Sequence, residues 1–279
     1  MLAALLNGQP IDSNLPIIHM NDRGWQYGDG VFETMLLKAS RVRFWQDHVQ
    51  RLQEGCERLR MPPPSQTVLQ QELALLIGKQ TDGVVKFILT RGRGGRGYRP
   101  DPATTPTRVW QLFPALSPQP AAIALRCCDT RLSRNSLLAG IKHLNRLEQV
   151  LAQAEWDDTS IAEGLLLDTE GELVCGTMSN LFLVLDGVLV TPDLRYSGVR
   201  GVMRKNVLQL ASTLNMVTEE RAVWPQELTV AQEVFITNAL RGIKPVVALR
   251  SGSEIEQQWG VGEITAALLT AVDSVQPRS

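Results

Sequence analysis

A single lysine, Lys142, stands among apolar residues in the stretch LLAGIKHLNRLE (137–148), just before a predicted helix. An amine that is held among apolar groups and near another cation shifts toward its neutral, nucleophilic form. Such an amine can bind a carbonyl group covalently or remove a proton as a general base. The local sequence also permits a solvated surface lysine, which is the commoner case, so this interpretation needs support from other segments.

Two further segments contain residue types that bind phosphate. Arg51 lies beside the apolar position Leu52 in a predicted helix, and a guanidinium group can bind phosphate through two parallel hydrogen bonds. In SGVRGVM (197–203) a glycine-containing turn leads into a helix, whose first N–H groups can hold an anion without a charged side chain. Taken singly, an exposed helix arginine and an ordinary loop are the simpler interpretations.

A glycine- and arginine-rich loop, RGRGGRGYR (91–99), follows a predicted strand. It could be a solvated flexible loop or an RNA-binding tract, but one short copy in a chain of net charge −1 argues against RNA. A mobile loop over an active site fits better, because glycines allow hinge motion and arginines bind carboxylates. We therefore expect Arg91, Arg96 and Tyr98 to contact the carboxylates of a substrate.

The segment DRGWQYGDGVFET (22–34) combines glycines and aromatic residues just before a strand. A packed loop is the usual interpretation of such a segment. Thr34 would nevertheless lie at the start of that strand, where its hydroxyl could reach a substrate. Tyr27 is a further candidate for a substrate contact.

Both helices and strands are predicted around these residues, so we expect a mixed α/β (α+β) fold class. Apolar residues at helical spacing predict helices, and runs of β-branched and apolar residues predict strands. Asn7-Gly8 predicts the turn of an opening hairpin. The N-terminal elements expected are a hairpin around 5–11, strands at 31–37 and 84–90, and helices around 49–59 and 69–77.

The C-terminal part repeats this mixture. Leu144, Leu147, Leu151 and Ala154 share one face of a helix that would start directly after Lys142. The other elements expected are strands at 123–127, 164–167, 173–174, 180–185, 188–191 and 234–236, and helices that begin at 201 and span 264–272.

Proline and serine concentrate in PALSPQP (114–120), which predicts a linker at 115–120 between an N-terminal α/β domain (1–114) and a C-terminal α/β domain (121–279) that carries Lys142. A chain of 279 residues is long enough for two such domains.

The composition narrows the class of partner. Hydrophobic residues make up 44% and charged residues 20%, as in ordinary globular proteins, and a net charge of −1 creates no field that would gather nucleic acid or anionic membrane. No apolar run approaches the roughly 18 residues of a spanning helix. The four cysteines form no C-x-x-C spacing, and the three histidines lie far from any cysteine cluster. We expect no nucleic-acid or membrane partner, no metal site, and a reducing compartment, by default the cytoplasm.

Together these segments resemble one family. The stretches that carry the resemblance occur in the order DRGWQYGDGVFET, HVQRL, RGRGGRGY, AGIKHLNRLEQVLA, SNLFLV, GVRGVMR and VFITNAL. They are spread over nearly the whole chain and resemble the fold type IV pyridoxal-phosphate enzymes, the group of branched-chain and D-amino acid aminotransferases. AGIKHLNRLEQ and RGRGGRGY are typical of the aminodeoxychorismate lyase branch, whereas HVQRL and SNLF are shared more widely.

The resemblance implies a two-lobed fold with pyridoxal 5'-phosphate between the lobes, and usually a homodimer. It implies that Lys142 binds the cofactor covalently, and that the threonine typical of the lyase branch, Thr34, is a candidate proton donor. Arg51 would bind the cofactor's phosphate. Backbone N–H groups around Gly201, Val202 and Met203, and at Asn238 and Ala239, would bind the same phosphate.

One position departs from the family pattern. The family usually has a glutamate five residues before the asparagine of the NLF motif, next to the pyridine nitrogen of the cofactor, and this chain has Cys175 there. A carboxylate keeps the pyridine protonated, whereas a neutral thiol gives no such charge. Glu170 and Glu172, close by in the sequence, are the candidates to substitute for it. Transamination would be slowed most by the loss of this charge. A lyase would be slowed less, because the formation of an aromatic product drives its reaction.

The expected function is therefore a lyase that converts 4-amino-4-deoxychorismate to 4-aminobenzoate and pyruvate, a step of folate biosynthesis. A D-amino acid or branched-chain aminotransferase on the same fold is the first alternative. A protein that binds the cofactor but has weak or altered activity is the second, because of Cys175.

Overall fold

The computed structural model of the chain describes residues 1–252 and 254–274, which form two compact units. Unit 1 comprises residues 1–117 and 141–145, and unit 2 comprises residues 118–140 and 146–274. One segment differs from our expectation. We placed Lys142 in the C-terminal domain, but residues 141–145 pack with unit 1. The physical reason is that the backbone of 142–144 pairs with a strand of unit 1.

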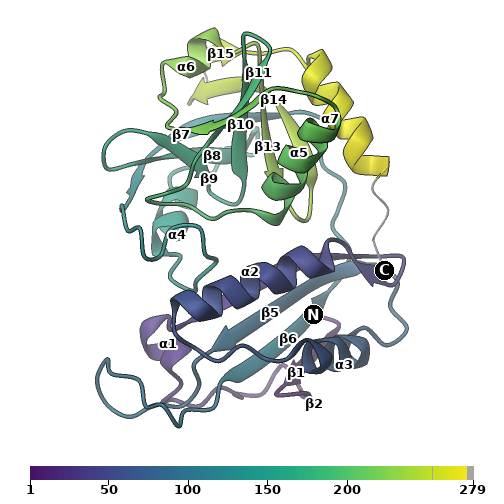
Figure 1. The fold of residues 1–279 in the computed structure, drawn as a ribbon, viewed down its shortest axis with the longest axis vertical. Helices are drawn as coiled ribbons and strands as arrows, with labels where there is room; N and C mark the ends of the chain where they lie inside the picture. The colour runs from purple at the N-terminus through teal and green to yellow at the C-terminus, as the bar shows by residue number, and fades with distance from the viewer. Residues whose placement is uncertain (253, 275–279) are drawn as a thin grey trace. The chain divides into compact units, whose positions relative to one another are not determined.

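Unit 1 is built on a six-stranded antiparallel sheet with the strand order β2-β1-β6-β5-β3-β4, in purple and blue in Figure 1. Two helices, α2 and α3, pack on this sheet and share one apolar core with it. The elements of unit 1 are β1 (Ala3–Leu6), β2 (Gln9–Pro10), α1 (Arg23–Tyr27), β3 (Gly30–Lys38), β4 (Arg41–Val42), α2 (Trp45–Arg58), α3 (Gln66–Ile77), β5 (Gly83–Thr90) and β6 (Thr107–Phe113).

Local chemistry explains where these elements begin and end. Asn7 and Gly8 both have positive φ (50° and 82°), as the tight turn between β1 and β2 requires. Helix α3 begins after Ser65, whose hydroxyl accepts a hydrogen bond from the N–H of Val68 (3.3 Å). It ends at Gly78, which takes up a positive φ of 54°.

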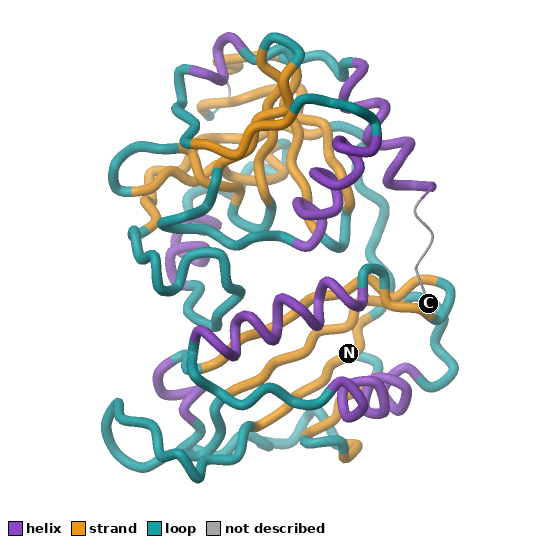
Figure 2. The backbone as a smooth tube through the Cα atoms, in the orientation of Figure 1, coloured by secondary structure: helices purple, strands orange, loops and turns teal. Residues whose placement is uncertain are grey.

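Unit 2 has one mixed sheet, and Figure 2 draws the strands in orange. The strand order is β12-β11-β10-β13-β14-β7-β8-β9, and β15 pairs with β14. Its largest apolar cluster joins residues from β7, β8, β10, β13 and β14. The elements are β7 (Ile123–Leu132), α4 (Leu147–Gln153), β8 (Ile161–Asp168), β9 (Leu173–Gly176), β10 (Asn180–Leu185), β11 (Val188–Pro192), α5 (Val202–Thr213), β12 (Thr218–Arg221), α6 (Glu227–Val230), β13 (Glu233–Asn238), β14 (Gly242–Ser251), β15 (Glu254–Gln258) and α7 (Glu263–Ser274).

Most predicted elements are confirmed, and two placements are wrong. The helix after Lys142 begins only at Leu147, so Leu144 lies outside it. The side chains of Leu147 and Leu151 are 76% and 62% exposed, so that helical face is not a core face within this chain. Thr34 lies in the middle of β3 and not at its start.

None of the helices within residues 1–252 and 254–274 is both long enough and apolar enough to cross a membrane. In the same part of the chain, no three or more His, Cys, Asp or Glu side chains gather in a way that could hold a metal ion.

Candidate active site

Lys142 is held in unit 1 by backbone pairing with β3. The N–H of Phe32 donates to the carbonyl of Lys142 (3.0 Å), and the N–H of Leu144 donates to the carbonyl of Gly30 (2.9 Å). This pairing places the Lys142 ammonium nitrogen 4.3 Å from the centre of the Phe32 ring. The half-buried amine therefore has a fixed apolar neighbour, as the sequence predicts.

Thr34 follows Phe32 by two residues on β3, so the two side chains point to the same face of the sheet. Lys86 on β5 pairs opposite Thr34, and its ammonium nitrogen lies 5.7 Å from the centre of the Phe32 ring. Two cations, a hydroxyl and an aromatic ring thus mark one face of this sheet. Lys86 was not among the predicted site residues.

Arg51 is buried on α2 and bound to Glu33 of β3. Its Nε donates to Oε1 of Glu33 (2.8 Å), and Nη2 donates to Oε2 (2.5 Å). His48 contacts the same carboxylate through Nδ1 (2.6 Å). The sequence analysis missed both partners of Arg51, although a charged residue at an inward position of an alternating strand was a signal for Glu33.

The charges of this cluster follow from burial and pairing. Burial raises the pKa of Glu33, but the charge of Arg51 and the hydrogen bond from His48 outweigh it and hold this pKa at about 2. Burial lowers the pKa of His48, against the opposing effect of Glu33. We infer an ionised Glu33, a neutral His48 that donates from Nδ1, and a guanidinium group locked in one orientation.

The glycine- and arginine-rich loop has a structural and an exposed part. Arg91 is buried, and its guanidinium group donates to Asp29 and to the carbonyls of Leu59 and Arg60. These bonds tie the start of the loop to unit 1, so we correct the expectation that Arg91 contacts substrate. A sequence cannot separate a loop-anchoring arginine from a substrate-binding one.

The exposed part of the loop contains the remaining candidates for substrate contact. Arg96 is exposed, and Tyr98, which is 84% exposed, meets the edge of the Tyr27 ring at 5.5 Å between ring centres. Arg23 holds this part of the loop in place, because its terminal nitrogens donate to the carbonyls of Gly97 (3.0 Å) and Tyr98 (2.7 Å).

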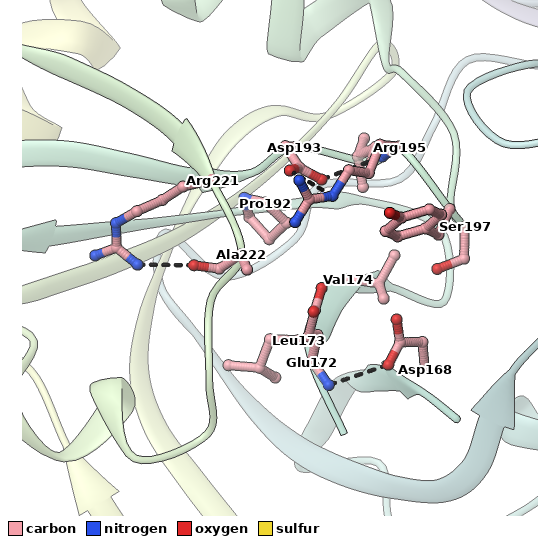
Figure 3. A pocket seen from close by; sticks show the side chains of 12 residues that line it. Asp168, Glu172, Leu173, Val174, Pro192, Asp193, Arg195, Ser197, Arg221 and Ala222 are labelled. Atoms are coloured by element: carbon pink, nitrogen blue, oxygen red, sulfur yellow. Dashed lines mark hydrogen bonds and ion pairs between the residues drawn. The ribbon is translucent and has the colours of Figure 1, made fainter. Parts of the chain in front are cut away.

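Cys175 is buried on β9 of unit 2, in an apolar cluster with Cys128 and Leu166. Burial raises the pKa of its thiol to about 12, so the side chain is neutral at pH 7. The Glu172 carboxylate faces Arg134 (3.7 Å) and lies in the pocket drawn in Figure 3, so it does not replace a glutamate at position 175.

The other buried acid near Cys175, Glu163, is not available for that role either. Its carboxylate accepts hydrogen bonds from the N–H of Met178 (2.5 Å) and the hydroxyl of Ser179 (2.9 Å). It therefore fixes the turn between β9 and β10.

The pocket in Figure 3 contains none of the predicted site residues. Its charged groups already have partners, since Arg195 pairs with Asp193 (3.1 Å) and Arg221 donates to the carbonyl of Ala222 (2.8 Å). Within unit 2, the predicted phosphate-binding residues lie instead at the start of α5 and the end of β13.

Helix α5 begins with an open N-terminus. Its first residues are Val202 and Met203, both buried, and Gly201 at the N-cap offers no side chain to their N–H groups. At the end of β13, Oδ1 of Asn238 accepts from the N–H groups of Leu240 (3.1 Å) and Arg241 (2.8 Å), which shapes the turn that contains Ala239.

Comparison with known proteins identifies the family. The model of the amino-transferase class IV family matches residues 30–249, most of the chain. The chain belongs to this family.

Among its relatives, an aminodeoxychorismate lyase from Vibrio harveyi is 37% identical over 263 residues, which cover 92% of this chain and 96% of that protein. The crystal structure of 4-amino-4-deoxychorismate lyase from Pseudomonas aeruginosa is 43% identical, with a TM-score of 0.88 over 98% of this chain and 99% of that one. A D-alanine aminotransferase from Bacillus licheniformis is 28% identical over 255 residues, 89% of this chain and 88% of that protein. The fold is thus the mixed α/β fold of the fold type IV enzymes.

Proposed function

We propose that this protein is a pyridoxal-phosphate-dependent lyase that converts 4-amino-4-deoxychorismate to 4-aminobenzoate and pyruvate, in folate biosynthesis. The observation that carries the proposal is the amine of Lys142, fixed 4.3 Å from the Phe32 ring by pairing with β3. The choice of a lyase is supported by the full-length similarity to two aminodeoxychorismate lyases, at 37% and 43% identity, against 28% for the aminotransferase.

The residues of the chain fit the cofactor. Lys142 offers an amine for its aldehyde, and Arg51 offers a locked guanidinium group for its phosphate. In unit 2, the uncapped N–H groups of Val202 and Met203 are suited to binding a phosphate, and a Cβ at Gly201 would overlap Oδ1 of Asn180. When bound, pyridoxal phosphate withdraws electrons from the carbon that carries the substrate's amine.

The chain's own groups then move the protons. The amine of Lys142 would remove the proton from the amine-bearing ring carbon as a general base. Thr34, on the same sheet face as Phe32, or Lys142 itself donates a proton to the departing enolpyruvyl oxygen. The ring becomes aromatic, and the released enol becomes pyruvate. Arg96 and Tyr98 of the exposed loop, together with Tyr27 of α1, bind the substrate's carboxylates and ring.

Cys175 supports the lyase over the aminotransferase. With a thiol pKa of about 12, it supplies no negative charge to a pyridine nitrogen. Transamination needs a strongly stabilised carbanion and reprotonation on the cofactor, whereas the lyase reaction gains from aromatisation.

The test supplies the holoenzyme with 4-amino-4-deoxychorismate and measures 4-aminobenzoate and pyruvate, beside an assay of amino-group exchange between D-alanine or a branched-chain amino acid and a keto acid. We expect equal amounts of the two lyase products and slow exchange. Exchange that is faster than lyase turnover would assign the aminotransferase function instead. Absence of both reactions in a protein that retains the cofactor would favour a weakly active cofactor-binding protein.

We also propose a homodimer in the cytoplasm. The outer face of α4 carries three exposed apolar side chains, Leu147, Val150 and Leu151, which a second copy of the chain would cover. All four cysteines are free thiols, which suits a reducing compartment.

A further inference from the structure

A cavity lies inside unit 1, between the sheet and the helices α2 and α3 that pack on it. Its wall includes Glu33 of β3 and both Trp45 and His48 of α2. About 200 Å³ between the wall side chains is not filled by atoms, compared with the roughly 30 Å³ that one water molecule occupies in the liquid. The other six wall residues, among them Phe87 and Trp110, are apolar or aromatic.

Two buried nitrogen atoms of this wall have no hydrogen-bond partner among the described residues. They are Nε1 of Trp45 and Nε2 of His48, and the His48 side chain as a whole is only 1% exposed. A buried polar atom without a partner is costly, and nearly all such atoms in folded proteins are satisfied by protein groups or by ordered water. A molecule in the cavity is therefore expected to bind both nitrogens.

The two nitrogens have complementary roles. The indole N–H of Trp45 can only donate a hydrogen bond. Nδ1 of His48 contacts the Glu33 carboxylate (2.6 Å), so the neutral ring carries its proton there and leaves Nε2 as an acceptor. Trp45 and His48 are three positions apart on α2, which brings their side chains to the same helix face.

These roles define the chemistry of the bound molecule. It must be neutral, because the wall is mostly apolar, and it must both accept and donate a hydrogen bond. An apolar molecule would leave Trp45 and His48 unsatisfied. Water is the smallest molecule that meets these requirements.

We propose that this cavity binds one water molecule, which accepts a hydrogen bond from Nε1 of Trp45 and donates one to Nε2 of His48. The water extends the ionic cluster of unit 1, because His48 donates to Glu33 and Glu33 binds Arg51. By occupying Nε2, it holds the His48 proton on Nδ1, where the carboxylate accepts it. His48 is thus a positioning residue for the ion pair of Glu33 and Arg51.

The first measurement is a high-resolution crystal structure of the full chain. We expect one ordered water molecule at about 2.7–3.2 Å from both Nε1 of Trp45 and Nε2 of His48. A cavity without such a water, or a water that contacts only one of the two nitrogens, overturns the proposal. The site involves neither cofactor nor substrate, so this test is independent of the proposed function.

The second measurement is the ¹⁵N NMR signal of the His48 ring, in protein labelled only at histidine. The chain has three histidines, so His48→Asn identifies the signal by its loss. In the wild type we expect a proton on Nδ1 and an Nε2 signal shifted by an accepted hydrogen bond. Trp45→Phe removes the indole N–H, and it should move the Nε2 signal toward that of a nitrogen without a hydrogen bond.

Trp110→Phe is the matched control. Trp110 lines the same cavity, but its Nε1 already donates to Glu72 (2.8 Å). This variant should lower the melting temperature and leave the His48 signal unchanged. An unchanged Nε2 signal in Trp45→Phe, or an equal shift in Trp110→Phe, overturns the role of Trp45 in binding the water. If a variant does not fold, the two wild-type measurements still decide the matter.

Discussion

The side chains of Lys142 and Lys86 both lie against the ring of Phe32, at 4.3 and 5.7 Å, yet only Lys142 is proposed to bind the cofactor. We expect Lys142→Ala to lower lyase turnover by about 1,000-fold or more, because it removes both the covalent attachment and the general base. Lys86→Ala is the matched control and should stay within about tenfold of wild type. Product formation in stopped assays measures both, and near-normal turnover by Lys142→Ala would contradict the assignment.

At position 175 the decisive property is charge. Cys175→Glu would introduce a carboxylate into the apolar cluster that holds the thiol, and the pyridine nitrogen would then stay protonated. Amino-group exchange should accelerate at least about tenfold, equivalent to about 1.4 kcal/mol of carbanion stabilisation. The pH dependence of the cofactor's absorbance and the exchange rate measure the effect. Cys128→Ala, in the same cluster, is the control; unchanged absorbance and rate in Cys175→Glu would refute our account of this position.

At the scale of elements, the ion pair between Glu33 and Arg51 joins strand β3 to helix α2. Glu33→Gln removes one partner of a buried pair and should lower the free energy of unfolding by about 3 kcal/mol at pH 7, measured by urea denaturation. It should also lower the affinity for the cofactor, because Arg51 loses its fixed orientation. Glu54→Gln, an exposed position on the same helix, is the control.

The same pair predicts a pH dependence. The pKa of Glu33 falls from its ordinary 4.5 to about 2 on folding, so the carboxylate contributes stability above pH 4.5 and loses it as the pH drops toward 2. The stability difference between wild type and Glu33→Gln should therefore shrink over this window. A difference that stays constant from pH 5 to pH 2.5 would show that the Glu33 pKa is not depressed.

At the scale of the whole molecule, we propose that a second copy of the chain covers the apolar face of α4. Leu151→Asp places a charge in the middle of this face and should convert the proposed dimer to a monomer, measured by light scattering after size exclusion. Val230→Asp, on the equally exposed α6, should leave the assembly unchanged. A wild-type monomer at micromolar concentration would refute the dimer.

Much of the fold was predictable because each signal was local. Each of these signals involves only residues that are neighbours in the sequence: the Asn7-Gly8 turn, the proline run after α2 and the buried apolar run of β5. The start of α4 was misplaced, because residues 142–144 satisfy their backbone groups by pairing with β3 and not by starting a helix. Such long-range pairing leaves no periodic pattern in the sequence.

The sequence by itself determined the chemical types at the proposed site: a lysine, an arginine and a helix start that we propose to bind phosphate, and a thiol where a carboxylate is usual. Only the tertiary structure decided which side chains hold them in place. Glu33 binds Arg51, 18 positions away, and Asn180 binds the N–H of Gly201, 21 positions away. A hydrogen bond depends on distance and direction in space, and the sequence alone gives neither for residues that are far apart in the chain.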